Sequence, residues 1–439
     1  MPAYAASEKS PSPFAELVEL EDGDTFIFLG DSITHQCLYS QYVETYFYTR
    51  YPHKRIHFRN AGVSGDQVGD ALLRFEEEVA VFEADYVSVL LGMNDGRYRY
   101  FDHEIFSRYE IGMGQLLDQL GNISEVIPMG PTYFDTRSVR LYENAAHWVN
   151  TRDEMRDYYP PVLAFYSEWV AERAQLGGFN FVDMATPMRR LTFAQRRKDP
   201  SFTLAKDAVH PEAKGHVVMA TAMLQDAFKI EPVSEIMISL NRKGRIEKSD
   251  ANGLIENLVS KKGHVSFDFT ATALPWVLPY SAHEGFELVN AAERFSRESL
   301  QVSGLKEGEY ELNIDLVPIG RYSDVQLAMG IELHALAHAP QYKQAMAVAT
   351  LNKDRNEQAI KPMRDLWLSR KVKLRSEESW LEESQAHPDY TPRKASYDAE
   401  MDSFYSTLKE LEALAMEFED KIYAANEVPP RSYSLTLVD

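Results

Sequence analysis

From Thr25 to about Lys229 the sequence alternates between short apolar runs and longer amphipathic stretches. Short apolar runs are typical of buried strands, and apolar residues that recur every three or four positions are typical of helices. Strands that alternate with helices favour right-handed crossovers and a parallel sheet covered on both faces. We therefore predict a three-layer, doubly wound α/β fold for this part of the chain.

The predicted strands are Thr25–Leu29, Arg55–Asn60, Asp85–Leu91, Ser124–Met129 and Phe179–Val182. Helices are expected at Gln67–Val81 and Phe106–Leu120, with Ile111 on the apolar stripe of the second. Ligands of such folds bind at the carboxyl ends of the strands. The residues that follow each strand are therefore the candidates for a functional site.

These positions carry the groups that acyl transfer through a serine requires, namely a nucleophile, a base, an acid and donors for the oxyanion. Ser32 follows the first strand and is the candidate nucleophile. His210 is its candidate base, and Asp207, three residues earlier, can orient the imidazole ring. The candidate oxyanion donors are the backbone N–H groups of Ser32 and Gly65 and the side-chain amide of Asn94.

Each of these residues also has a simpler interpretation. Ser32 and His210 could cap helices, and Asn94-Asp95 could form an ordinary turn. Asp31 is expected to tie down loop backbone, and His35 is expected on a polar helix face rather than at the substrate. A metal centre at Asp207 and His210 lacks a third ligand at helical spacing, so neither a metal nor a cofactor is expected.

Taken together, Gly30-Asp31-Ser32, Gly65, Gly92-x-Asn94-Asp95 and Asp207-x-x-His210 resemble the four ordered blocks of the SGNH (GDSL) hydrolase family. The resemblance covers about half of the chain. It implies a flavodoxin-like sheet and the hydrolysis of carboxylic esters, including acetylated sugars, lipids and thioesters. It also implies that Ser32, Gly65, Asn94 and His210 are the four family residues, with Asp207 as the acid of the triad.

Aromatic and basic residues follow the third and fourth strands, and we expect Arg97, Tyr133, Arg137 and Trp148 to contact substrate. Aromatic faces with polar margins suit sugar rings, whereas a long-chain lipase would be expected to offer a broader aliphatic groove. Either arginine could contact a carboxylate such as that of a uronic acid. The alternative is that the aromatic residues only pack the loop from Pro131 to Pro161 onto the sheet.

The composition narrows the possible partners. With 67 acidic and 46 basic residues the net charge is -21, which argues against binding to nucleic acid or to an anionic membrane. The single cysteine, Cys37, excludes an internal disulfide. The chain as given begins without a signal-peptide pattern and has no apolar span of membrane length, so we expect a soluble protein, either cytoplasmic or exported after removal of a signal peptide.

The pattern changes after Lys229, and we divide the chain into an N-terminal segment 1–24, a hydrolase domain 25–230 and a C-terminal domain 231–439. Strands are expected at Ser234–Leu240, Val265–Phe269, Phe286–Val289, Glu309–Ile314 and Ser432–Val438. Apolar residues from Phe404 to Ile422 recur at spacings of three and four, which predicts a helix, and the segment from Pro340 to Leu368 is its expected partner. The C-terminal half is thus predicted to be a small β domain that carries a helical hairpin.

This C-terminal half is similar to the tails of some bacterial SGNH proteins. It could bind glycan, mediate homo-oligomer formation, cover the active site or simply pack against the hydrolase domain. For the whole chain, the preferred hypothesis is a serine esterase that removes small acyl groups, acetyl first, from a carbohydrate without a cofactor. The alternatives are an arylesterase or lysophospholipase and, from another class, a glycan-binding scaffold whose catalytic blocks are vestigial.

Overall fold

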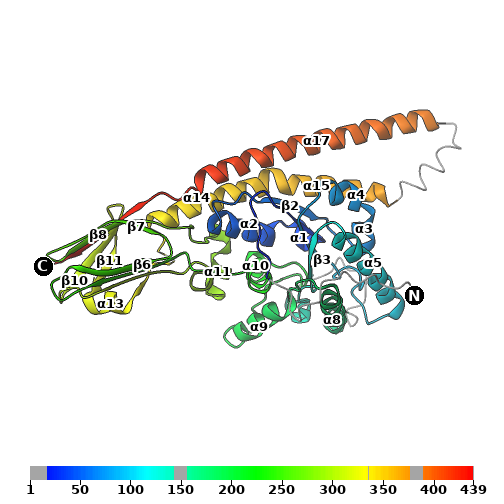
Figure 1. The fold of residues 1–439 in the computed structure, drawn as a ribbon. Coiled ribbons are helices and arrows are strands. Elements are labelled where there is room, and N and C mark those ends of the chain that lie inside the picture. Colours follow the sequence, from blue (N-terminus) through cyan, green and yellow to red (C-terminus); the bar gives the residue numbers. More distant parts are fainter. Residues whose placement is uncertain (1–16, 143–155, 335, 376–388, 439) are drawn as a thin grey trace.

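The computed structural model describes residues 17–142, 156–334, 336–375 and 389–438. Figure 1 shows an α/β part formed by the first half of the chain, a β part at its left, and two long helical segments that run beside both. The C-terminus lies at the far end of the β part. Among the described residues, no helix combines the length and the apolar character needed to cross a membrane.

A four-stranded parallel sheet forms the centre of the α/β part, in the order β2-β1-β3-β4. The strands are β1 (Thr25–Gly30), β2 (His57–Gly62), β3 (Tyr86–Leu90) and β4 (Glu125–Met129). The parallel sheet and its helices confirm the predicted fold class. The strand expected at Phe179–Val182 is reduced to a single bridge between Val182 and Met129, so that prediction was wrong in extent.

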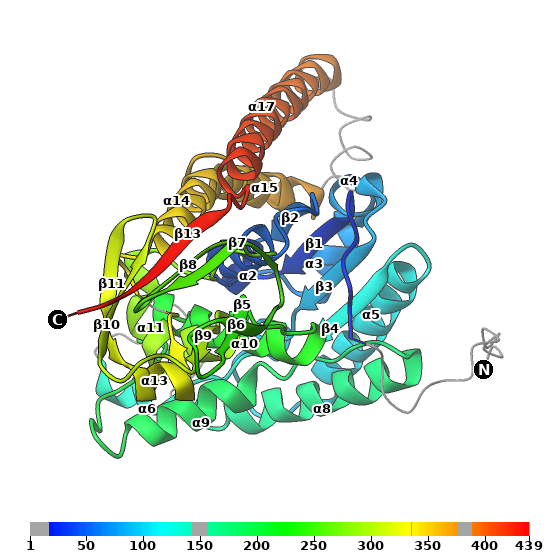
Figure 2. The same ribbon diagram turned by 60° about the vertical axis from the view of Figure 1, so that its left-hand side comes forward.

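Helices cover both faces of this sheet (Figures 1 and 2). Phe28 packs edge-on against Tyr39 of α2, and Phe26 packs against Phe228, which follows α10 directly. On the other side, α5 and α8 both contact β4. The helices of this part are α1 (Ser32–His35), α2 (Leu38–Arg50), α3 (Val68–Leu73), α4 (Phe75–Glu78), α5 (His103–Gly121), α6 (Thr136–Leu141), α8 (Tyr159–Gly177), α9 (Ala185–Gln195) and α10 (Ala213–Ala227).

Two expectations about these helices were wrong. The single helix expected at Gln67–Val81 is interrupted at Arg74, which leaves the helical conformation with a φ of -106° and separates α3 from α4. The Arg74 guanidinium is fully buried against Glu78, four residues ahead, and against Asp66. Asp66 precedes α3, so local periodicity does not report that contact. Ile111 is 70% exposed because the buried face of α5 runs through Tyr109 and Met113 instead.

The β part is built from two sheets, one with the order β11-β10-β13-β8-β7 and the other with the order β12-β9-β5-β6. Apolar residues from both sheets form a separate core, including Ile236, Phe267, Leu300 and Leu312. The predicted C-terminal β domain is therefore present. Its strands are β5 (Ser234–Leu240), β6 (Ile246–Ala251), β7 (Leu254–Lys261), β8 (His264–Thr270), β9 (Glu298–Ser303), β10 (Glu309–Ile314), β11 (Val317–Ser323), β12 (Ile331–Glu332) and β13 (Arg431–Leu437).

The strand expected at Phe286–Val289 was wrong, because this segment belongs to helix α11 (His283–Leu288). Phe286 packs edge-on against Trp276, and a short apolar run of this kind fits a buried helix as well as a strand. Two further short helices, α12 (Ala291–Phe295) and α13 (Asp324–Met329), also lie between the strands.

The expected helical hairpin is formed by α14 (Pro340–Arg355), a π-helical turn η3 (Asn356–Ile360), α15 (Lys361–Leu374) and α17 (Tyr390–Ala425). It is attached to the α/β part by buried polar contacts. Asn352 donates a hydrogen bond to the carbonyl of Gln41 in α2, and Arg355 pairs with Glu44 of the same helix. α15 contacts the edge strand β2, which brings it close to the loop that follows that strand.

Candidate active site

The sharp turn between β1 and α1 places Ser32 at the first position of the helix. The capping role that Ser32 could have taken is filled by Asp31, whose Oδ1 accepts a hydrogen bond of 2.9 Å from the Ile33 N–H. The hydroxyl of Ser32 is therefore available for another partner at the carboxyl edge of the sheet.

That partner is His210. The Ser32 Oγ lies 2.8 Å from the His210 Nε2, and the Nδ1 of the same ring lies 2.6 Å from the Asp207 Oδ2. The second oxygen of Asp207 accepts the backbone N–H groups of Val209 and His210 at 3.0 and 2.7 Å. One carboxylate thus fixes both the loop and the imidazole ring, leaving Nε2 to accept the serine proton.

The Asp207 carboxyl is kept ionised by this arrangement. Burial works against the charged form, but the hydrogen bonds from His210 outweigh it and hold the pKa of Asp207 below its usual value. Between the two residues, Ala208 adopts a left-handed conformation with a φ of 75°. A non-glycine residue in this conformation indicates that the loop is firmly held by its surroundings.

Two backbone donors lie in the segments that follow β1 and β2. Within the described part of the chain, the N–H groups of Ser32 and Gly65 have no hydrogen-bond acceptor. Gly65 has a φ of +75°, which side chains with a Cβ rarely adopt. This loop conformation explains the glycine more directly than close packing does, because a Cβ there would meet only the Lys371 Nζ, at 3.7 Å.

The amide of Asn94 is held at this edge from both ends. The Tyr98 hydroxyl donates to the Asn94 Oδ1 at 2.9 Å, and the Asn94 Nδ2 donates to the Asp66 carbonyl at 3.0 Å. The second Nδ2 proton faces the Asp31 Oδ2 at 3.4 Å. Because that contact is long, the proton can be redirected to a substrate oxygen.

Two buried carboxyls lie beneath these loops. Burial raises the pKa of Asp31 to about 7 and the pKa of Asp95 also to about 7. Asp95 accepts the N–H of Val68 at 2.9 Å, which fixes the start of α3. Both groups are partly protonated near neutral pH, which limits the negative charge beside Ser32.

Two of the four expected substrate-contacting residues line different hollows of the structure. Tyr133 lines a hollow with Arg189 and Phe193, whereas Arg97 lines a separate hollow with Gln67 and Arg108. Arg137 is exposed on α6. Trp148 lies outside the described residues, and a substrate contact by any of these four residues stays a prediction.

The expectation for His35 was wrong, since its side chain is buried rather than set on a polar helix face. Its Nδ1 accepts the N–H of Ser64 at 3.2 Å, and its Nε2 lies 2.9 Å from the Asp365 Oδ1 of α15. Burial lowers the pKa of His35 to about 4, so the ring is neutral near pH 7. It supports the loop next to Gly65.

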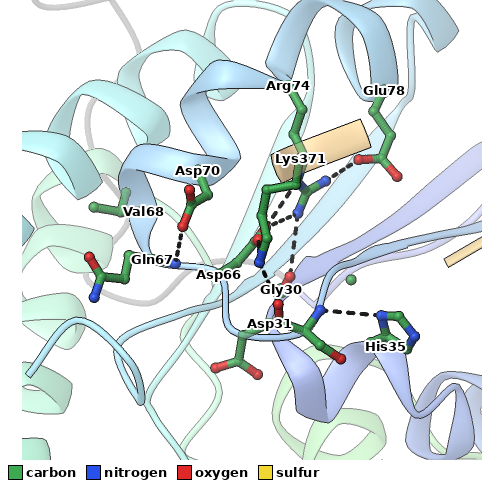
Figure 3. Close-up of polar contacts among 12 residues, drawn as sticks. Gly30, Asp31, His35, Asp66, Gln67, Val68, Asp70, Arg74, Glu78 and Lys371 are labelled. Carbon is green, nitrogen blue, oxygen red and sulfur yellow. Dashed lines mark hydrogen bonds and ion pairs between the residues drawn. The ribbon is translucent and has the colours of Figure 1, made fainter. Parts of the chain in front are cut away.

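Sequence reasoning missed a buried charged cluster beside this loop (Figure 3). The Asp66 Oδ2 accepts from the Arg74 Nε at 2.9 Å and Nη2 at 2.6 Å, and the Asp66 Oδ1 lies 3.1 Å from the Lys371 Nζ. Asp66 directly follows Gly65, a candidate site residue, and this position could have suggested that the Asp66 carboxylate is buried with a charged partner. Lys371 is about 300 residues away in the chain and carries no motif.

Among the described residues, no group of three or more His, Cys, Asp or Glu side chains is arranged to hold a metal ion. The groups that meet at the carboxyl edge are instead a hydroxyl, an imidazole, a carboxylate and amide donors. Chemically, this set can deprotonate an alcohol and accommodate a developing oxyanion.

Comparison with known proteins agrees with the sequence blocks of the first half of the chain. Residues 28–218 match the model of the GDSL-like Lipase/Acylhydrolase family. An acetylxylan esterase of Geobacillus stearothermophilus is 27% identical over 233 residues, which are 48% of this chain and 96% of that protein. The crystal structure of Axe2, an acetylxylan esterase from the same organism, covers 48% of this chain and 96% of its own at 26% identity and a TM-score of 0.38.

The similarity to one solved structure extends over both halves of the chain. BT4096, a gut microbial diltiazem-metabolizing enzyme, is 25% identical, covers 97% of this chain and 100% of its own, and superposes with a TM-score of 0.78. The α/β fold and its ordered blocks define an ester-hydrolase domain. The matches identify residues 28–218 as a domain of the SGNH (GDSL) hydrolase family.

Proposed function

We propose that this protein is a serine esterase that removes acetyl groups from an acylated carbohydrate, with Ser32 as nucleophile, His210 as general base and Asp207 as the acid that orients it. The observation that carries this proposal is the hydrogen-bonded chain from the Ser32 Oγ through His210 to Asp207. The acetylxylan esterase relative supports the acetyl and carbohydrate parts of the proposal.

In the first step, the Ser32 Oγ attacks the ester carbonyl and its proton passes to the His210 Nε2. The carbonyl oxygen becomes negative and accepts hydrogen bonds from the N–H groups of Ser32 and Gly65 and from the Asn94 Nδ2. Collapse of this intermediate breaks the ester bond, and His210 gives the proton to the departing sugar oxygen, which leaves as a hydroxyl group. Ser32 then carries the acetyl group.

In the second step, a water molecule gives its proton to His210 and attacks the acetyl carbonyl. The bond to the Ser32 Oγ breaks, the proton returns to Ser32, and acetate leaves. No residue is consumed and no further reactant is needed. Removal of one oxyanion donor typically costs about 3 kcal/mol of transition-state stabilisation.

The test is turnover of 4-nitrophenyl acetate by the wild type and by Ser32→Ala. We expect the variant to lose nearly all activity while its thermal unfolding is unchanged, because Ser32 does not cap α1. Undiminished turnover would remove Ser32 from its proposed role. Asn94→Ala should lower kcat about a hundred-fold.

Substrate class is tested separately, by acetate release from a panel of acetylated oligosaccharides and by the rate ratio of acetate to octanoate esters. The proposal expects acetate esters to be favoured. Faster octanoate turnover would point to an arylesterase or lysophospholipase instead. Saccharide binding that ignores acetylation and needs only residues after 230 would favour the glycan-binding scaffold.

A further inference from the structure

A buried lysine of the C-terminal hairpin touches the peptide group that carries one of the proposed oxyanion donors. The Lys371 Nζ of α15 donates a hydrogen bond to the carbonyl oxygen of Ser64. That carbonyl and the N–H of Gly65 belong to one planar peptide unit. In a trans peptide the C=O and N–H bonds point in opposite directions, so a donor that holds the carbonyl from behind also fixes the direction of the N–H.

The preceding peptide group is held as well. The Ser64 N–H donates to the His35 Nδ1, which places the ring proton of the neutral imidazole on Nε2, facing Asp365. Asp365 and Lys371 both come from α15. The loop between β2 and α3 is therefore anchored on either side of Ser64 by the same helix of the hairpin.

The charge of Lys371 also matters, because its side chain is only 6% exposed and screening by water is weak. A positive group on the Ser64 carbonyl polarises the peptide and makes its N–H a stronger donor. The ammonium is compensated on one side by Asp66, at 3.1 Å. Figure 3 shows Lys371 and Asp66 clustered with Arg74 next to Gly30 and Asp31.

We propose that Lys371 is a positioning residue of the oxyanion site, which holds and polarises the Ser64–Gly65 peptide, and that Asp365 supports it through His35. This inference rests on the proposed function, since it assigns the Gly65 N–H to the oxyanion. It gives the C-terminal hairpin a role in the chemistry of the first half of the chain. The hairpin completes the oxyanion loop in addition to packing against the α/β part.

The competing interpretation is that Lys371 only attaches the hairpin, as any buried ion pair would. The neighbouring Arg370 offers a matched control. It is on the same helix, its side chain is 4% exposed, and it pairs with Glu77 at 2.7 Å in the α/β part. Both residues thus link α15 to the α/β part, and among the contacts of the described residues it is Lys371 that donates to the Ser64 carbonyl.

The experiment compares Lys371→Met, Lys371→Arg and Arg370→Met in the full chain, with kcat and KM measured separately on 4-nitrophenyl acetate and thermal unfolding recorded for each. Lys371→Met should lower kcat at least about ten-fold with little change in KM, because the lost interaction acts in the transition state. Lys371→Arg should recover most of the kcat, since a guanidinium can also donate to the carbonyl and to Asp66. Arg370→Met should keep kcat within about two-fold of the wild type.

A Lys371→Met variant that folds and has the kcat of Arg370→Met would overturn the proposal. If Lys371→Met does not fold, Asp365→Ala decides, because the Asp365 side chain is 58% exposed and its removal leaves the core intact. The expected result is then a lower kcat at unchanged KM, and a wild-type kcat would overturn the proposal.

Ser32→Ala in the same assay separates this inference from the proposed function. Loss of turnover in Ser32→Ala combined with a wild-type kcat in Lys371→Met would defeat only the inference. Retained turnover in Ser32→Ala would defeat the proposed function itself.

Discussion

Asp207 performs two tasks with its two oxygens, and a single substitution separates them. In Asp207→Asn, the Oδ1 can still accept the N–H groups of Val209 and His210, so the loop keeps its shape. The new NH2 group would face the His210 Nδ1, which must then accept and leave the ring proton on Nε2. An imidazole with that tautomer cannot take the proton of Ser32, so kcat should fall about ten-thousand-fold, or about 5 kcal/mol.

Asp207→Ala removes both tasks. It leaves two backbone N–H groups without their acceptor, at about 1 kcal/mol each, so its free energy of unfolding should be about 2 kcal/mol below that of Asp207→Asn. The assay is kcat on 4-nitrophenyl acetate at pH 8, beside urea unfolding of both variants. An Asp207→Asn variant that keeps a tenth of the wild-type kcat, or that is as unstable as Asp207→Ala, would refute this reasoning.

Three further predictions concern other parts of the structure. Tyr98→Phe removes the donor to the Asn94 Oδ1 and frees the amide to rotate, so kcat should fall about five-fold at unchanged KM, as measured by steady-state kinetics. Gly65→Ala forces a Cβ into a φ of +75° and should cost about 1 kcal/mol in urea unfolding. Burial raises the pKa of Glu298 from 4.5 to about 7, so the folded state holds the extra proton between these values and stability falls as pH rises through them. Glu298→Gln should therefore match the wild type in free energy of unfolding near pH 4.5 and exceed it at pH 8, by up to about 3 kcal/mol, as measured by urea unfolding.

The parts of the site that follow from local sequence were open to prediction. Gly30-Asp31-Ser32 marks the end of a buried strand and the start of a helix, and the order of strands and helices predicts a parallel sheet whose carboxyl ends meet at one edge. The structure brings Ser32, Asn94 and the Asp207–His210 loop to that edge. The long helix of the hairpin was also predictable, because apolar residues between Phe404 and Ile422 recur every three or four positions.

The errors at Arg74 and His35 both involve contacts with residues outside the local helical pattern. The helix is interrupted at Arg74, whose guanidinium is buried against Asp66, a residue that precedes α3. His35 is buried because α15 covers it, and no feature near residue 35 reports a helix that lies more than 300 residues away. Lys371 reaches Ser64 for the same reason. Contacts of this kind depend on how the two halves of the chain pack.

The most direct test of the central claim is to find where the acyl group goes. The protein is mixed with 4-nitrophenyl acetate, quenched in acid within the first turnovers, and digested for peptide mass spectrometry. The account predicts one added acetyl group on the peptide that contains Ser32, located on the Ser32 Oγ by fragmentation and missing from Ser32→Ala. An acetyl group on another side chain, with the Ser32 peptide unmodified during turnover, would contradict it.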